Sequence, residues 1–177
     1  MKIICISGHA QNGKDTFATY LLDVMQLIGR DKVLIVHYAD LLKYVCRQFF
    51  DWDGMKDDHG RGLLQHVGTD VVRSKAPDYW AKFIVDIISF FPDKWDYIII
   101  PDCRFENEIQ IFKDAGYDVI HARVERDGYD NHLTDEQKNH KSETALDGTT
   151  PDVVIKNNGG LFDLIKSAVT FIGEYIL

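Results

Sequence analysis

A short glycine-bounded loop near the start of the chain has the residue types needed to hold a chain of phosphates. Gly8 and Gly13 are separated by four residues, and Lys14 follows directly. Glycines let the backbone turn so that successive N–H groups point at phosphate oxygens, and the lysine ammonium reaches the β- and γ-phosphates. We therefore expect ATP to bind here, with Lys14 catalytic. The residues expected to contact it are Gly8, Gln11, Asn12, Gly13, Lys14, Asp15 and Thr16.

One position of this loop departs from the usual pattern. Asp15 stands where a Ser or Thr normally contacts Mg²⁺, and Thr16 comes next. Two interpretations stay open. Asp15 supports Mg²⁺ directly or through water, or it caps the following helix while Thr16 offers its hydroxyl to phosphate.

A second set of charged residues follows the strongly apolar run at 97–100. Asp102 is placed where a carboxylate would face the phosphate loop and hold Mg²⁺ through water, although an Asp after a strand is also ordinary turn chemistry. Arg104 comes two residues later. Its planar guanidinium suits a phosphate through paired hydrogen bonds, so we expect a catalytic arginine at the phosphate-binding crevice.

The elements that must position these groups alternate between strand and helix. Continuous apolar runs indicate strands buried on both faces, and near-helical spacing of apolar residues indicates the helices between them. The pattern predicts an α/β, three-layer P-loop NTPase fold with a mainly parallel five-stranded sheet, as one domain over 1–177. The expected strands are 2–6, 32–37, 97–100, 118–124 and 153–155, and the expected helices are 17–28, 40–50, 63–74, 79–91, 106–115 and 161–175.

Two polar stretches interrupt this alternation. Residues 51–62 are rich in Asp and Gly and predict a loop. Residues 125–151 have little apolar periodicity, and a stretch of that length in a compact domain is usually a functional lid or a mobile loop. We call residues 125–151 the lid segment.

Composition narrows the classes of partner. The net charge of −8 makes nucleic acid an unfavourable partner, because the molecule as a whole repels polyanions. The three cysteines and seven histidines lack the spacing of a zinc site. No apolar run reaches the length that spans a membrane, so we expect a cytoplasmic protein acting on small molecules. The oligomeric state is left open between a monomer and a homodimer.

The loop also carries a resemblance to a known family. The order Ser7-Gly8, then Gly13-Lys14-Asp15-Thr16, resembles the phosphate loop of the phage-type deoxynucleoside monophosphate kinases, a branch of the nucleoside monophosphate kinases. The resemblance implies ATP- and Mg²⁺-dependent phosphorylation of a deoxynucleoside monophosphate, and it implies that Arg104 contacts the acceptor's phosphate. Further similar segments are YADLLK at 38–43, LQHVGTD at 64–70, YW at 79–80, IPDCR at 100–104, VIH at 119–121, HLT at 132–134 and VIKN at 154–157.

Acceptor-binding residues are expected between the second strand and the lid segment. By resemblance Asp40 and Lys43 begin the acceptor lobe, although Asp40 could equally be a helix N-cap. Helical spacing places 61/65/69 and 66/70/73 on neighbouring faces that could read a base edge and a phosphate, or be ordinary exposed surface. Trp80 could stack on a base or pack in the core. The expected acceptor-binding residues are Asp40, Lys43, Arg61, Gln65, Thr69, Asp70, Trp80 and Arg104.

The lid segment offers the last catalytic candidate. Arg123 and Arg126 bracket its start, and lids of nucleotide kinases commonly bring arginines to the transferring phosphoryl group on closure. We expect Arg126 to be catalytic; an exposed charge pair is the alternative. Two other functions remain: a P-loop kinase of another small phosphorylated metabolite, and a nucleotide-binding regulatory NTPase. The second is disfavoured because the guanine-reading N-K-x-D motif is absent.

Overall fold

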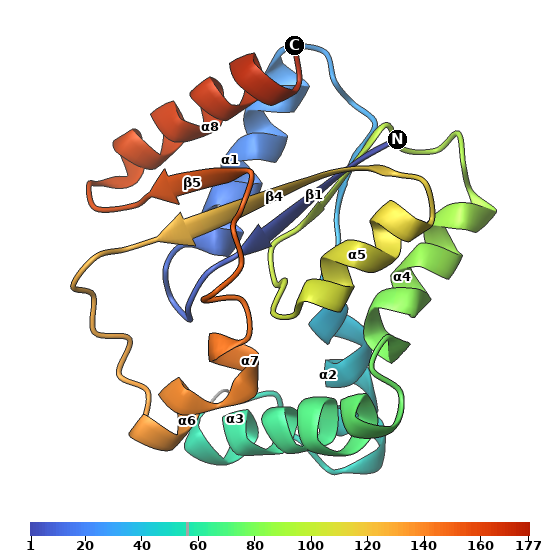
Figure 1. Cartoon of the computed structure of the whole chain (residues 1–177), viewed down its shortest axis with the longest axis vertical. Coiled ribbons are helices and arrows are strands. Elements are labelled where there is room, and N and C mark those ends of the chain that lie inside the picture. Colours follow the sequence, from blue (N-terminus) through green and yellow to red (C-terminus); the bar gives the residue numbers. More distant parts are fainter. Residues whose placement is uncertain (56) are drawn as a thin grey trace.

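The computed structural model describes residues 1–55 and 57–177, and strands and helices alternate as predicted (Figure 1). All four strand pairs are parallel, and the sheet order is β2-β3-β1-β4-β5. The predicted five-stranded parallel sheet is confirmed. The elements are β1 (Lys2–Ser7), α1 (Lys14–Leu27), β2 (Val33–Ile35), α2 (Tyr38–Phe49), α3 (Asp58–Gln65), the π-helix η1 (His66–Arg73), α4 (Tyr79–Phe90), β3 (Tyr97–Ile100), α5 (Glu106–Asp114), β4 (Asp118–Glu125), α6 (Asp135–Asn139), α7 (Lys141–Thr144), β5 (Val153–Lys156) and α8 (Leu161–Tyr175).

The central strand β1 is buried on both faces, and successive residues serve opposite cores. Ile4 and Ile6 pack with α1 and α8, whereas Ile3 and Cys5 pack with α4 and α5. Side chains alternate across a strand, so a continuous apolar run is what a middle layer requires. The three-layer arrangement follows, with α1 and α8 on one side of the sheet and α4 and α5 on the other (Figure 1).

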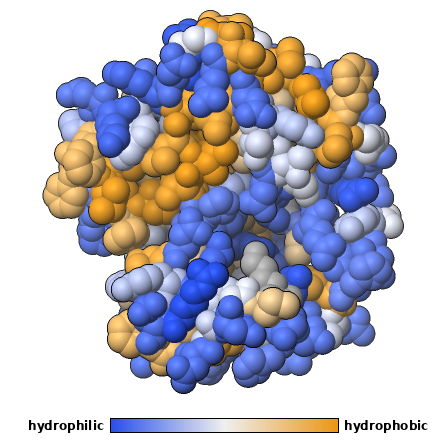
Figure 2. Space-filling model, turned by 180° about the vertical axis from the view of Figure 1, so that it is seen from behind, coloured by the Kyte–Doolittle hydropathy of each residue, from blue (hydrophilic) through white to orange (hydrophobic). Residues whose placement is uncertain are grey.

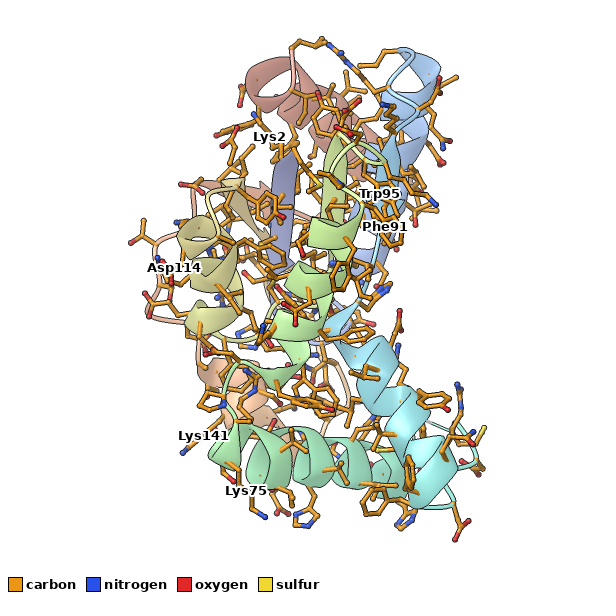
Figure 3. All side chains as sticks on the ribbon, turned by 90° about the vertical axis from the view of Figure 1, so that its right-hand side faces the viewer. Lys2, Lys75, Phe91, Trp95, Asp114 and Lys141 are labelled. Atoms are coloured by element: carbon orange, nitrogen blue, oxygen red, sulfur yellow. The ribbon has the colours of Figure 1, made fainter. Side chains whose placement is uncertain are left out.

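A further group of helices lies beyond the carboxyl ends of the strands. In Figure 1, α2, α3, α6 and α7 gather below the strand arrowheads, and the loop after β1 points toward them. Figure 3 shows α3 and η1 crossing the end of the molecule that is far from Lys2, with Lys75 and Lys141 nearby. Ligands of open α/β sheets bind at the carboxyl edge, so these helices are placed to form a site there.

The segment between α2 and α4 differs from the prediction. Helix α3 begins at Asp58, inside the expected loop 51–62, because the Asp57 carboxylate caps it by accepting the Gly60 N–H at 2.8 Å. The expected α-helix over 63–74 is also wrong in type. It is the end of α3 followed by η1, which is a π-helix.

The lid segment is more ordered than its polar composition suggested. Its first residue belongs to β4, and it contains the short helices α6 and α7. Leu133 and Leu146 are buried, and Thr134 caps α6 by accepting the Gln137 N–H at 3.2 Å. Two buried apolar anchors and a capped helix hold the segment against the rest of the molecule.

Apolar side chains also gather on the outside of the molecule. Phe83, Ile87 and Phe90 are exposed at helical spacing along α4. The rear view shows an apolar area in the upper half and mainly polar side chains below (Figure 2). Across the described part of the chain, no helix is both long and apolar enough to cross a bilayer.

Candidate active site

The phosphate loop between β1 and α1 requires both of its glycines. Gly8 has a φ of +137°, and a Cβ there would lie 2.2 Å from the Val124 carbonyl oxygen of β4. Gly13 has a φ of +95°, and a Cβ there would lie 2.5 Å from the Asn157 amide nitrogen. Both residues have left-handed backbone conformations that favour glycine, and at Gly8 a side chain would also clash with the backbone of β4. Helix α1 then begins at Lys14, with its N-terminus directed at the loop.

Hydrogen bonds to β4, to the residue after β5 and to the lid segment hold the loop in shape. The Asn12 amide donates to the Val124 carbonyl at 3.2 Å, and the Asn157 amide donates to the Asn12 carbonyl at 2.9 Å. On the lid side, Gln11 donates to the Asn131 carbonyl at 3.0 Å and accepts from the Tyr129 hydroxyl at 3.2 Å. Asn12 is buried, so its side chain is part of the structure that fixes the loop.

Lys14 lies buried under this loop. Its ammonium donates to the Gly8 and His9 carbonyls, each at 2.8 Å. Burial, with Arg104 nearby, lowers the pKa of Lys14 to about 8. A desolvated ammonium interacts strongly with any anion that reaches it, because few water molecules screen it.

Asp15 does not cap helix α1. The N-cap is Gly13, which makes no side-chain cap, and Asp15 lies in the first turn with its carboxylate 2.9 Å from His37 Nε2. The capping interpretation is therefore wrong. This hydrogen bond raises the pKa of His37 above its usual value. Thr16, half-buried in the same turn, remains a predicted phosphate contact.

Asp102, which was expected either to support Mg²⁺ or to form a turn after the strand, caps helix α2. Its two oxygens accept the Tyr38 and Ala39 N–H groups of α2, at 3.0 and 2.9 Å. Asp40, a candidate N-cap, instead lies inside α2 and pairs with Lys43 at 2.9 Å. Burial raises the pKa of the Asp102 carboxyl above its usual value.

The two carboxylates predicted to support Mg²⁺ line the same cavity. Asp15 and Asp102 both face it, at the edge next to the phosphate loop. Within residues 1–55 and 57–177, no cluster of three or more His, Cys, Asp or Glu could hold a metal by itself. Mg²⁺ commonly uses one or two carboxylates together with substrate phosphates and water, so this pair fits that mode.

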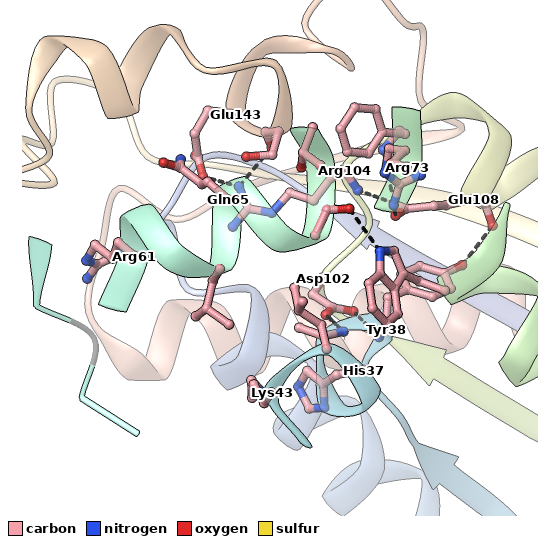
Figure 4. Close-up of a pocket in the computed structure, with 18 of the residues that line it drawn as sticks. His37, Tyr38, Lys43, Arg61, Gln65, Arg73, Asp102, Arg104, Glu108 and Glu143 are labelled. Carbon is pink, nitrogen blue, oxygen red and sulfur yellow. Dashed lines mark hydrogen bonds and ion pairs between the residues drawn. The ribbon is translucent and has the colours of Figure 1, made fainter. Parts of the chain in front are cut away.

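This cavity, of about 280 Å³, lies between the carboxyl edge of the sheet and the helices beyond it. It brings together most of the predicted acceptor residues with several that the sequence did not single out (Figure 4). Asp40 and Asp70 are not among its lining residues. The predicted residues that line it are Lys43, Arg61, Gln65, Thr69, Trp80 and Arg104; His37, Arg73, Glu108 and Glu143 join them.

The π-helix explains which face of this segment lines the cavity. Arg61, Gln65, Thr69 and Arg73 are spaced four apart, and all four line it. In a π-helix each hydrogen bond joins residues five apart, so a turn contains more residues than in an α-helix. Residues four apart therefore stay on one face through η1. Arg73 thus joins the face of Gln65, which corrects the expected grouping with position 70. Asp70 instead lies 3.5 Å from His140 Nε2.

A buried carboxylate joins η1 to the loop after β3. Glu108 is 1% exposed; one oxygen accepts from Arg73 at 2.5 Å, and the other accepts the Arg104 and Phe105 N–H groups at 2.6 and 3.0 Å. The Arg73 guanidinium also lies 4.0 Å from the centre of the Phe105 ring. Glu108 therefore sets the position of the Arg104 backbone. Figure 4 shows Glu108 and Arg73 on the wall of the cavity.

Trp80 is both a core residue and part of the cavity wall. It is 4% exposed, packs with Ile84 and Ile88, and donates its indole N–H to the Gly68 carbonyl at 3.0 Å. The core interpretation is confirmed. One edge of the ring still borders the space where an acceptor would lie.

The lid helix α7 joins the phosphate loop to Arg104. Arg104 donates to the Ser142 carbonyl at 3.0 Å and forms an ion pair with Glu143 (Figure 4). The other oxygen of Glu143 accepts the Ala10 N–H of the phosphate loop at 3.0 Å. A single carboxylate therefore spans the distance between a phosphate-loop amide and Arg104. No feature of the sequence pointed to Glu143, because its partners lie 39 and 133 residues away.

The two lid arginines differ in their surroundings. Arg123 is buried and holds the end of the lid segment, donating to the Leu146 carbonyl at 2.8 Å and pairing with Asp147 at 2.5 Å. The Arg126 guanidinium lies 4.0 Å from the centre of the Tyr129 ring, in a second hollow beside the phosphate loop. Arg123 is therefore an anchor, whereas a catalytic role for Arg126, which lies outside the main cavity, stays a prediction.

Two solved kinases have a similar fold. Shikimate kinase from Aquifex aeolicus aligns over 98% of this chain and 97% of its own, with a TM-score of 0.54 and 14% identity. The APS kinase CysC of Mycobacterium tuberculosis, in complex with AMPPNP and APS, aligns over 97% of each chain with a TM-score of 0.52 and 10% identity. At these identities the likeness shows the fold alone, and it confirms the predicted P-loop kinase architecture.

Sequence relatives are more specific. The deoxynucleotide monophosphate kinase of Enterobacteria phage T4 is 36% identical over 109 residues, which are 60% of this chain and 42% of the T4 protein. A protein described as a putative deoxynucleotide monophosphate kinase, from Acanthamoeba polyphaga mimivirus, is 26% identical over 89% of both chains. The match thus spans about two fifths of the T4 protein's length. The profile of the family described as deoxynucleotide monophosphate kinase matches residues 56–168, and the chain belongs to that family.

Proposed function

We propose that this protein transfers the γ-phosphoryl group of ATP to a deoxynucleoside 5′-monophosphate, giving the diphosphate and ADP. Membership of the family supports this activity. The observation that carries it is the short distance between two anion-binding groups. The amide of Ala10 and the guanidinium of Arg104 contact opposite oxygens of one carboxylate. Two phosphates held by those groups would be close enough for direct transfer.

The donor side of the proposed site is the phosphate loop. Backbone N–H groups from Gly8 to Thr16 and the N-terminus of α1 would hold the ATP phosphates, and Lys14 would neutralise charge on the β- and γ-phosphates. Mg²⁺, bound with support from Asp15 and Asp102, would supply further positive charge to the same oxygens. Each of these groups stabilises charge that builds up during transfer.

The acceptor side is the cavity below the sheet. Arg104 would hold the monophosphate, and Glu108 fixes its backbone for that purpose. The base and sugar would lie along the aligned face of α3 and η1, where Gln65 and Thr69 offer hydrogen-bonding groups and the edge of Trp80 forms an apolar wall. Lys43 and Arg61 would contribute further positive charge. Asp40, through Lys43, and Asp70, through His140, would act indirectly.

The reaction requires no covalent bond between the protein and a substrate. An oxygen of the acceptor phosphate attacks the γ-phosphorus, the bond from the γ-phosphorus to the bridging oxygen breaks, and ADP leaves with the electron pair. The acceptor phosphate is already a competent nucleophile, so a general base is unnecessary. Arg126 would move from Tyr129 to the transferring group as the lid segment closes and excludes water.

A panel of acceptors tests this proposal. ADP release is measured with ATP, Mg²⁺ and each deoxynucleoside monophosphate in turn, beside small phosphorylated metabolites that lack a base. We expect at least one deoxynucleotide to give rapid ADP release and a diphosphate product. Release stimulated only by a metabolite without a base would leave the donor site in place and contradict the nucleotide acceptor.

A further inference from the structure

Glu143 occupies an unusual place for a carboxylate in a site that binds polyanions. Its side chain is 6% exposed, accepts the Ala10 N–H at 3.0 Å and forms an ion pair with Arg104. The positive charge of Lys14 lies close enough for Glu143 to be among the groups that raise its pKa. One negatively charged group thus bonds to an amide and a guanidinium, and interacts through charge with an ammonium; all three groups also suit phosphate.

Helix α7 holds Glu143 in this place from both ends. At its start, His140 lies 3.5 Å from Asp70 of η1 and caps the helix through the Ser142 N–H at 3.2 Å. Just after it, the Leu146 carbonyl accepts from buried Arg123 at 2.8 Å. The contact of Glu143 with the phosphate loop is therefore supported by its neighbours on either side.

A phosphate and this carboxylate compete for the same groups. An amide N–H makes one strong hydrogen bond, so Ala10 serves either Glu143 or a phosphate oxygen. Two anions brought together in a site with little water repel each other strongly. Binding of the ATP phosphates at the loop therefore requires Glu143 to leave it.

We propose that Glu143 is a gate residue, whose carboxylate holds the place of a phosphate between Ala10 and Arg104 and is displaced when nucleotide binds. The acceptor half of this inference rests on the proposed function, because it assigns Arg104 to the acceptor phosphate. An acceptor that engages Arg104 removes one partner of Glu143 and so favours its release from the loop. The gate links the two substrates: acceptor binding makes the donor loop more accessible.

Donor binding without acceptor tests the gate. Calorimetry measures the Kd of the full chain for the Mg²⁺ complex of a non-hydrolysable ATP analogue, in the wild type and in Glu143→Gln. The substitution keeps the size of the side chain and removes its charge. We expect binding to tighten about tenfold, the gain expected if the gate is open in about one molecule in ten.

The matched control is Glu136→Gln, which removes the same charge from an exposed position of the neighbouring helix α6. Its Kd should stay at the wild-type value. Equal tightening in the control would assign the effect to net charge and overturn the gate, as would unchanged or weaker binding in Glu143→Gln.

A second variant covers the case in which Glu143→Gln does not fold. Glu143→Asp keeps the charge but shortens the side chain, so its reach to Ala10 is lost and binding should again tighten. Wild-type affinity in Glu143→Asp would overturn the gate. No analogue binding by any form would contradict the donor site and with it the proposed function, a result distinct from equal binding, which contradicts the gate alone.

Discussion

The phosphate loop and the cavity proposed to hold the acceptor meet at the same edge of the sheet but are built in different ways. The loop is one run of residues between β1 and α1, and its shape is fixed by glycines pressed against β4 and Asn157. The cavity is lined by residues of α1, α2, α3, η1, α4 and α5, of the loops after β2 and β3, and of the lid segment. The donor site is therefore local in the sequence, whereas the acceptor site depends on contacts between distant segments.

Because the two regions are built differently, substitutions in each should have different effects. A substitution in the loop removes a group that acts on the phosphates directly, because the loop backbone is held independently by Asn12 and Asn157. A substitution around the cavity also moves its neighbours, because Glu108 and Glu143 each tie two segments together. Substitutions on the two sides should thus separate into effects on turnover and effects on acceptor binding.

The largest effect is expected from Lys14→Ala. Turnover should fall by at least about 1000-fold, because the charge that stabilises the transferring phosphoryl is lost. Circular dichroism should still report a folded protein. Lys166→Ala, on the exposed face of α8, is the control. Turnover near wild type in Lys14→Ala would contradict the donor assignment.

The acceptor side is tested by Arg104→Ala. The KM for the acceptor should rise on the order of 100-fold, since a charged, paired hydrogen-bond donor to phosphate is removed. Affinity for the ATP analogue should hold or improve, because Glu143 loses a partner as well. A loss of ATP affinity with an unchanged acceptor KM would place Arg104 on the wrong substrate.

An intermediate effect is expected from Arg126→Ala in the lid segment. If this charge reaches the phosphoryl group only on closure, kcat should drop roughly 30-fold while both KM values change little. Steady-state kinetics with each substrate varied in turn measures the split. An unchanged kcat would return Arg126 to a surface role beside Tyr129.

The smallest effect concerns pH. The pKa of Lys14 is lowered to about 8, so its ammonium is present below that pH and is lost as the pH rises through it. Phosphates bind the ammonium form, so the affinity for the ATP analogue should fall about tenfold between pH 7 and pH 9, with proton uptake on binding above pH 8. Lys14→Arg stays charged and should remove the slope; the same slope in that variant would assign the titration to another group.

The sequence predicted the place of the glycine loop between β1 and α1 well because its signals are local. The spacing of Gly8, Gly13 and Lys14 alone predicts a phosphate-binding loop. The predicted bounds also agree with the structure for the strand at Tyr97–Ile100 and the helix at Leu161–Tyr175. Apolar periodicity reports burial residue by residue, so the five strands were identifiable from the sequence.

The acceptor side was harder to predict because it depends on contacts between residues that are far apart in the sequence. Asp102 caps a helix 63 residues earlier in the chain, and Glu143 contacts a loop 133 residues before it. The bond pattern of η1, which moves Arg73 onto the face of Gln65, has no simple signal in residue type. Such contacts depend on the assembled fold, and spacing along the chain does not encode them.

The most direct test of the account compares ATP consumption by the wild-type protein with and without an acceptor. With ATP and Mg²⁺ alone, ADP release should be slow. Without an acceptor, Glu143 competes for the phosphate loop and the open lid segment keeps Arg126 away from the γ-phosphate. Adding the preferred deoxynucleoside monophosphate should raise the rate by at least about 100-fold, with one diphosphate formed for each ADP. Rapid ADP release that is insensitive to every deoxynucleotide would contradict the account.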